Sequence, residues 1–238
     1  MDIVIDALLT GDVRPLGDSG RDSGIDKHPV AGPLWLGAQG LRGDAQADRR
    51  FHGGPEKALH HYARDHYPDW LRELGARAVL DAPGAFGENL STTGMTEHDV
   101  CVGDIYAAGE ALIQVSQARQ PCWKLNHRFD HAGMAARVQA SGKTGWYYRV
   151  LRAGWLAPGD VLSLRERPHP QWTLARVQDI LNRRVLDVPT LSELAALPTL
   201  SPNWRALFEK RARLGQIEDW QPRLQGDAAG PRTGTPST

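Results

Sequence analysis

The sequence predicts a mainly β protein, a barrel or a sandwich, that continues into a small bundle of three helices. The first observation is a series of short apolar runs in residues 1–168, separated by turns rich in glycine and proline. The second is a change to helical spacing of the apolar residues after residue 172. Many short strands with such turns are typical of barrels and sandwiches, not of a doubly wound α/β sheet.

Six runs of the first part are predicted strands because they are short, apolar and bounded by turn residues. They are 3–5, 34–36, 59–62, 104–106, 111–115 and 161–164. The aromatic run 144–150 is compatible with a further strand beside a pocket, although core packing is the more common role of such residues.

Two helices are expected among these strands. The first spans 65–80, where Tyr67, Trp70 and Leu74 fall on one face. The second spans 129–140 and is followed by Ser-Gly. The polar segment 11–28 is longer than a strand needs, and we expect it to form a mobile flap near the functional site.

The chain is expected to divide at a linker of alternating proline residues at 167–170. Helical spacing follows in three segments, with Thr173 as a cap of the first. The tail consists largely of Gly, Pro, Ser and Thr and has almost nothing to bury, which predicts disorder. The predicted helices are 173–182, 190–197 and 201–214, and the predicted domains are 1–168, 169–225 and the tail 226–238.

Composition limits the classes of function. Formal net charge is zero over 238 residues, so no general electrostatic field attracts nucleic acid or anionic membrane. Two cysteines are too few for a disulfide framework, which favours the cytoplasm. We expect no secretory signal and no membrane span, because no basic-then-apolar leader and no sufficiently long apolar run is present.

The segment around Cys122 carries the strongest chemical signal. A strand-like run ends in a polar turn with Arg119, and Lys124 follows the cysteine. Nearby positive charge favours the thiolate, which is the form that binds metals and attacks electrophiles. The residues alone leave a metal ligand, a nucleophile and an inert buried thiol open.

A second cluster lies at residues 49–62. Its two adjacent glycines allow close backbone approach to a ligand, and His52 and Lys57 flank them, which suits an anion. His60 and His61 would face opposite sides of a strand and so cannot share one metal ion. A hairpin with structural histidines remains the alternative. The third cluster, Gly84–Ser91, would wrap a ligand or only form turns.

Taken together, these segments resemble the MOSC domain, named for the C-terminal part of the molybdenum-cofactor sulfurase. The matching motifs are His-Gly-Gly-Pro-Glu-Lys-Ala at 52–58, Gly-Glu-Asn-Leu at 87–90, Val-Gly-Asp at 102–104 and Gln-Ala-Arg-Gln-Pro-Cys at 117–122. The bacterial YiiM type of this family is the most similar. The resemblance implies a MOSC-type β-barrel with peripheral helices plus a small C-terminal three-helix bundle.

The resemblance also implies the molybdenum cofactor and the reduction of N-hydroxylated compounds such as 6-hydroxylaminopurine, a detoxifying activity. Cys122 would supply the thiolate to molybdenum and act as the catalytic residue. Arg119, with Lys57, would hold the cofactor's terminal phosphate. The expected cofactor-binding set is completed by Gln117, His52, Gly53, His61, Asn89 and Lys124.

An external flavoprotein is the implied electron donor, because two cysteines cannot ligate an iron–sulfur cluster. The helical bundle is a candidate docking surface for it, or a homodimer contact. Two other functions stay open: a module that carries the cofactor or its sulfur without reducing anything, and a zinc or cysteine-nucleophile hydrolase that uses the histidines.

Overall fold

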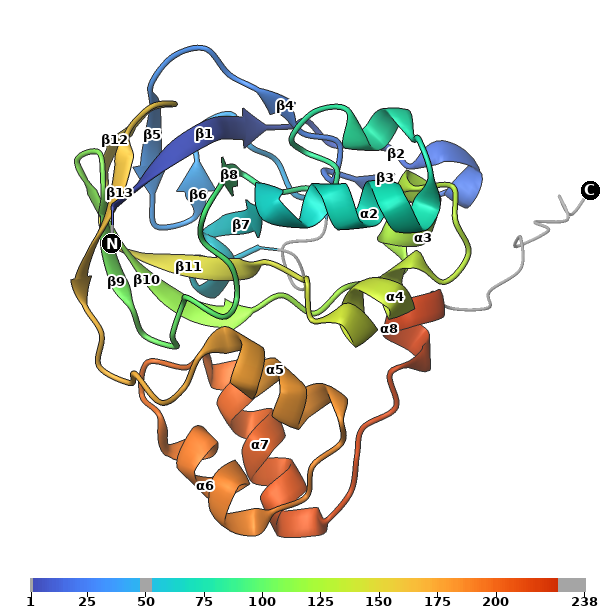
Figure 1. Cartoon of the computed structure of the whole chain (residues 1–238), viewed down its shortest axis with the longest axis vertical. Coiled ribbons are helices and arrows are strands. Elements are labelled where there is room, and N and C mark those ends of the chain that lie inside the picture. Colours follow the sequence, from blue (N-terminus) through green and yellow to red (C-terminus); the bar gives the residue numbers. More distant parts are fainter. Residues whose placement is uncertain (1, 48–52, 227–238) are drawn as a thin grey trace, which may run out of the picture.

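The computed structural model describes residues 2–47 and 53–226, and seven strands close into a barrel (Figure 1). Around the barrel their order is β13-β9-β10-β11-β7-β8-β1, and β13 pairs back onto β1. Only β7 and β8 are parallel; the other neighbours are antiparallel. Because β13 pairs with β1, the sheet is closed, and the fold is a barrel and not a sandwich. The strands are β1 (Asp2–Thr10), β7 (Leu59–Ala63), β8 (Leu90–Thr92), β9 (Ile105–Ala108), β10 (Ala111–Ala118), β11 (Trp146–Arg152) and β13 (Val161–Glu166).

Short strands extend this frame. The end of β1 pairs with β4 (His28–Pro29), and β2 (Arg14–Pro15) pairs with β3 (Asp22–Ser23) in the predicted flap. A three-stranded sheet is formed by β5 (Leu34–Gly37), β6 (Gly40–Leu41) and β12 (Gly154–Leu156). All six predicted strands are present, and the aromatic run 144–150 lies mostly in β11.

The helices of the first part differ from the prediction in their ends. The first, α2 (Tyr67–Leu74), stops because Gly75 has a φ of 75°, and single 3-10 turns at Arg64–His66 and Ala78–Leu80 flank it. The second, predicted at 129–140, is α4 (Met134–Ser141), which begins later than expected, and a separate short helix that was not predicted, α3 (Lys124–Arg128), precedes it. Asp130, with a φ of 44°, lies in the turn between them.

Three helices follow the barrel as predicted, and they lie below it in Figure 1. They are α5 (Leu174–Asn182), α6 (Val188–Ala196) and α7 (Pro202–Leu214). The Thr173 cap is confirmed, since its hydroxyl accepts a hydrogen bond from Arg176 N at 3.2 Å. The start of α6 is earlier than predicted because Asp187 caps it. A further short helix, α8 (Gln221–Gln225), was not predicted.

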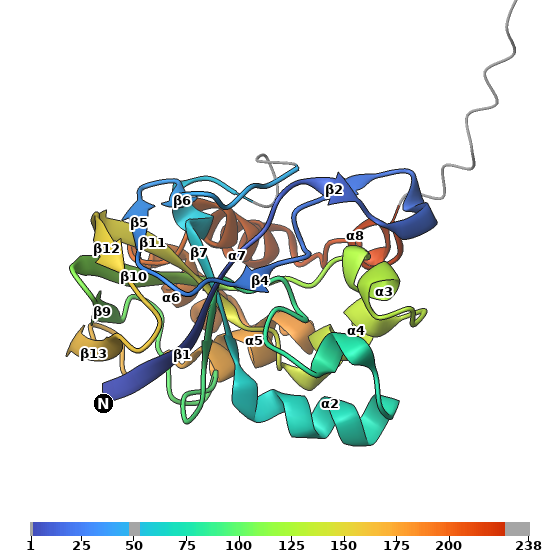
Figure 2. The same ribbon diagram turned by 90° about the horizontal axis from the view of Figure 1, so that it is seen from above.

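One continuous hydrophobic core joins barrel and helices. Val102 and Val115 of the barrel belong to the same buried cluster as Trp172, Val177 and Trp204. A second cluster lies under α2, α3 and α4, which gather on one side of the barrel (Figure 2). Of the helices that the structure describes, none is long and apolar enough to cross a membrane. The predicted tail beyond Gly226 lies outside the described residues, and the boundary at residue 168 stays a prediction.

Candidate functional site

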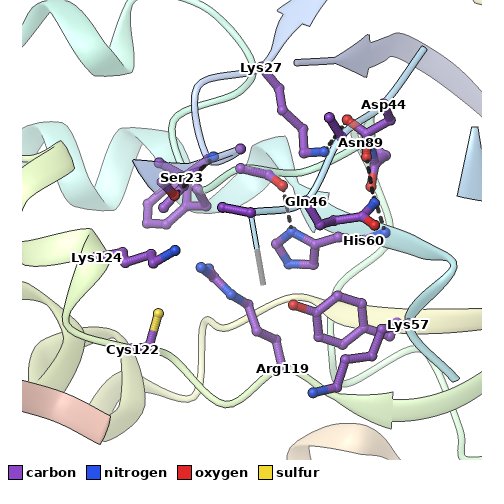
Figure 3. A pocket seen from close by; sticks show the side chains of 17 residues that line it. Ser23, Lys27, Asp44, Gln46, Lys57, His60, Asn89, Arg119, Cys122 and Lys124 are labelled. Atoms are coloured by element: carbon purple, nitrogen blue, oxygen red, sulfur yellow. Dashed lines mark hydrogen bonds and ion pairs between the residues drawn. The ribbon is translucent and has the colours of Figure 1, made fainter. Parts of the chain in front are cut away.

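A polar pocket, with about 570 Å³ of atom-free space that includes solvent at its open side, lies on the outer face of β7 and β11. The barrel wall, the flap and the segment 44–47 surround it (Figure 3). Its lining residues are Ser23, Gly24, Ile25, Lys27, Asp44, Ala45, Gln46, Ala47, Lys57, His60, Phe86, Gly87, Asn89, Arg119, Cys122, Lys124 and Tyr147.

The segment after β10 supplies the thiol and a buried cation. Arg119 is held by a hydrogen bond from its backbone N to Gly145 O at 2.9 Å, and only 7% of the residue is exposed. Its guanidinium points into the pocket (Figure 3). Among the residues described, its Nη1 has no hydrogen-bond partner. A buried, unsatisfied cationic donor is costly, so this atom indicates an anionic ligand that the pocket is built to receive.

Lys57 and Tyr147 form the wall next to Arg119 and Cys122. Lys57 closes the 3-10 turn η2 (Pro55–Lys57), and its Nζ lies 5.8 Å from the centre of the Tyr147 ring. Burial lowers the pKa of Lys57, although the negative charge that Cys122 can carry opposes this shift. Burial raises the pKa of Tyr147 against the effect of Arg119, so its phenol stays protonated at neutral pH.

An ion pair fixes the turn that carries Lys57. The Arg149 guanidinium binds the carboxylate of Glu56, and Arg149 Nη1 also donates to Gln114 Oε1 at 2.7 Å. The Ser116 hydroxyl donates to Glu56 O at 2.6 Å. The turn is therefore attached to both β10 and β11.

His60 and His61 face opposite sides of β7, as predicted, and it is His60 that lines the pocket. The His60 ring lies beside Tyr147, with centroids 5.0 Å apart. His61 points into the barrel, where its ring nitrogens bond the hydroxyls of Tyr148 at 3.0 Å and Thr92 at 2.8 Å. Burial lowers the pKa of His61 to about 3 and that of His60 well below its usual value, so both rings are neutral.

A buried network stabilises the opposite wall of the pocket. Lys27 and Asn89 both contact Asp44; Asn89 Nδ2 donates to Asp44 Oδ2 at 3.0 Å and to Leu9 O at 3.1 Å. Asn89 Oδ1 accepts from His60 N at 3.1 Å. Burial lowers the pKa of Lys27, and Asp44 opposes that shift. The Asn89 amide lines the pocket, but its main contacts are within the protein.

The Gly-Glu-Asn-Leu motif forms a loop around a buried carboxylate. Glu88 is 0% exposed, and its Oε1 accepts from Tyr67 Oη at 2.6 Å and Gly84 N at 2.7 Å. Its Oε2 accepts from Phe86 N at 3.0 Å. Glu88 therefore shapes the wall made by Phe86, Gly87 and Asn89 without lining the pocket itself.

The flap covers the pocket and is held at several points. Lys124 Nζ donates to Asp22 O at 3.0 Å, and Arg128 forms an ion pair with Asp26. Gly24 packs directly on the segment 44–47, since a Cβ there would lie 2.1 Å from Ala45 O. Ser23, Ile25 and Lys27 thereby line the pocket.

The structure brings together five of the residues expected to bind the cofactor, and it places others elsewhere. Cys122, Arg119, Lys57, Asn89 and Lys124 line the pocket. Three do not: His61 faces the barrel interior, Gln117 is buried with its Nε2 donating to Ala118 O, and Gly53 is not part of the lining. His52 lies outside the described residues.

Sequence reasoning missed several lining residues. For His60 the signal was incomplete, because alternation places two adjacent strand histidines on opposite faces without saying which of them faces the pocket. Lys27 lies in the segment expected to form the flap but was not singled out, and Asp44 had no signal, since their ion pair joins two loops that no motif connects. Tyr147 was noted only as part of an aromatic run.

The class of protein follows from comparison with family models. Residues 48–163 match the MOSC domain, and residues 172–213 match the YiiM-like, 3-alpha helix domain. The chain is 44% identical over 219 residues to protein YiiM of Escherichia coli strain K12, covering 92% of this chain and 97% of that protein. The protein therefore belongs to the YiiM-like MOSC-domain family.

Solved structures agree. The crystal structure of YiiM from Escherichia coli has a TM-score of 0.80 at 38% identity and covers 95% of this chain and 100% of that one. The crystal structure of YiiM from Geobacillus stearothermophilus has a TM-score of 0.75 at 35% identity, with 88% and 99% covered. A protein of Gibberella moniliformis named "Reductase" is 43% identical over 177 residues, which are 74% of this chain but only 31% of that protein.

Proposed function

We propose that this protein binds the molybdenum cofactor in the pocket and reduces N-hydroxylated compounds, such as 6-hydroxylaminopurine, to the corresponding amines. The observation that carries the proposal is the buried, unpartnered Nη1 of Arg119 in the same pocket as the thiol of Cys122. The MOSC family and the name of the fungal relative support a reductase.

The residues present fit such a cofactor. A thiolate is the soft ligand that suits a metal with sulfur chemistry, and Cys122 is placed to supply it. A terminal phosphate needs cationic donors, and Arg119 and Lys57 line the same pocket. When bound, the cofactor supplies the electron-transfer chemistry that breaks the N–O bond.

The protein's own residues bind and orient the cofactor and substrate and shield them from water. The flap and the segment 44–47 limit access of water to the pocket. The protonated phenol of Tyr147 and the side chain of Lys57 line the same pocket as Cys122 and Arg119 and are its candidate proton donors. The net reaction uses two electrons and two protons, converts N–OH to N–H and releases water. The electrons come from an external flavoprotein reductase.

Turnover by cofactor-loaded protein tests this proposal. Protein purified from a host that makes the cofactor is given an artificial reductant and 6-hydroxylaminopurine, and the amine is quantified. We expect turnover by the wild type, loss of turnover in Cys122→Ser, and wild-type rates in the control Cys101→Ser. Cys101 is the matched control because it is 1% exposed, its thiol contacts Pro170 O at 3.6 Å, and it is not among the residues that line the pocket.

Two results would contradict the proposal. Full activity of Cys122→Ser excludes the thiol as the ligand. Cofactor-loaded wild type that turns over no N-hydroxylated base is a carrier of the cofactor, not a reductase.

A further inference from the structure

The segment that follows the three-helix domain runs back to the barrel and contacts the loop that carries Cys122. After α7, Gly215 turns the backbone with a φ of 60°, and residues 215–226, which we name the strap, end in α8. Both views show α8 next to α3 and α4, and Cys122 lies just before the start of α3 (Figures 1 and 2).

The strap is anchored at its base. Arg211 of α7 is 1% exposed, and its guanidinium binds both oxygens of Glu218, at 3.0 and 2.6 Å. Trp220 Nε1 donates to Glu218 Oε1 at 2.7 Å, and the Arg184 guanidinium lies 4.7 Å from the Trp220 ring centre. The direction in which the strap leaves the helical domain is therefore fixed by a bidentate ion pair.

The other end of the strap holds both neighbours of Cys122. The Arg223 guanidinium donates to Pro121 O, and Arg223 O accepts from Trp123 N at 2.8 Å. Arg223 Nη2 also donates to Gln139 Oε1 of α4 at 2.6 Å. A single residue of the strap thus binds the backbone on each side of the cysteine and ties it to α4.

We propose that Arg223 is a positioning residue, which fixes the cysteine loop (residues 119–123) in the conformation that receives the cofactor. Arg223 does not line the pocket, so it acts through the loop and not by touching the ligand. A ligand thiolate must be held within a fraction of an ångström of its productive position, which a loop alone does not achieve. The inference rests on the proposed function only for the identity of the ligand.

Hydrogen–deuterium exchange and cofactor retention test this role in the full-length protein. In cofactor-free Arg223→Gln, we expect amide exchange in 119–126 to rise about tenfold, because a hydrogen bond from a charged donor is lost. Exchange in 174–214 should be unchanged. In cofactor-loaded protein, the variant should lose pterin during gel filtration about tenfold faster than the wild type. Arg223→Lys should bring both the exchange rate and the rate of pterin loss part of the way back to wild type, since an ammonium reaches one acceptor but not two.

Arg205→Gln is the matched control, because Arg205 also donates to a backbone carbonyl, Ala195 O at 3.0 Å, but within the helical domain. It should leave exchange in 119–126 and pterin retention unchanged. Gln139→Leu removes only the hydrogen bond between Arg223 and Gln139. It should change exchange in 119–126 and pterin retention in the same direction as Arg223→Gln but by less, which keeps the test decisive if Arg223→Gln folds poorly.

Wild-type exchange across 119–126 in Arg223→Gln would overturn the inference, and so would faster exchange with unchanged pterin retention. If wild-type protein itself retains no pterin, the proposed function fails. The exchange measurement on cofactor-free protein then still decides whether Arg223 orders the cysteine loop.

Discussion

Replacing Glu88 with glutamine tests how the pocket wall is built. The carboxylate is fully buried and accepts three hydrogen bonds, from Tyr67 Oη, Gly84 N and Phe86 N. Glutamine keeps one oxygen, but its amide group places a donor against a backbone N–H that then has no acceptor. Two charge-assisted bonds become neutral ones, at about 1 kcal/mol together, and the unsatisfied N–H costs about 2 kcal/mol.

We therefore expect Glu88→Gln to lower the free energy of unfolding by about 3 kcal/mol, and Tm by roughly 6–12 °C for a chain of this size. Glutamine avoids the desolvation of a charge, which works in the opposite direction, but three short bonds to the carboxylate outweigh it. Urea denaturation followed by tryptophan fluorescence measures the change, with Glu166→Gln, an exposed carboxylate of β13, as the control. A loss below about 0.5 kcal/mol, within the range of ordinary surface substitutions, would refute the reasoning.

Three further predictions concern the flap, the barrel interior and the cofactor. Gly87→Ala should lower the free energy of unfolding, measured by urea denaturation, by about 1 kcal/mol more than Gly94→Ala. Both glycines have a positive φ, but only a Cβ at Gly87 would approach Ile25 Cγ1, at 2.8 Å, and equal losses in the two variants would exclude the clash. For His61, with a folded pKa of about 3 against an ordinary value near 6.5, the unfolded chain takes up a proton that the folded chain does not as pH falls between these values. This group should thus lower the free energy of unfolding by about 1.4 kcal/mol for each pH unit between pH ~6 and ~4. In His61→Gln, the slope of the free energy of unfolding against pH should be shallower by that amount, and an unchanged slope contradicts the neutral buried ring. Arg119→Gln should weaken pterin retention at least about tenfold by removing a charged donor, and undiminished retention would separate Arg119 from the cofactor.

The strands could be predicted because short apolar runs and turn residues are local signals. Helix ends were less predictable. The expected helix 65–80 ignored Gly75, whose positive φ ends α2, and the short segment Gln221–Gln225 has too few residues to show helical periodicity. Closure of the barrel depends on β13 pairing with β1, a contact between the two ends of the domain that no local pattern reports.

The site was predictable where a motif places several groups close in sequence. Cys122 and Arg119 are three residues apart and share the pocket. The choice between His60 and His61 was not predictable, because alternation separates two faces without saying which one is the core. The pairing of β7 with β11 decides it, since it sets His61 against the buried Trp146. The role of Arg223 depends on a contact across 102 positions of the chain.

The molybdenum and pterin content of the purified protein tests the central claim most directly. Wild type and Cys122→Ser are produced in a host that makes the cofactor, purified in parallel and analysed for molybdenum, zinc and pterin. We predict stoichiometric molybdenum and pterin in the wild type and a strong loss of molybdenum in the variant. Zinc without molybdenum or pterin in the wild type, or equal molybdenum in both proteins, would contradict the assignment of this pocket and of Cys122.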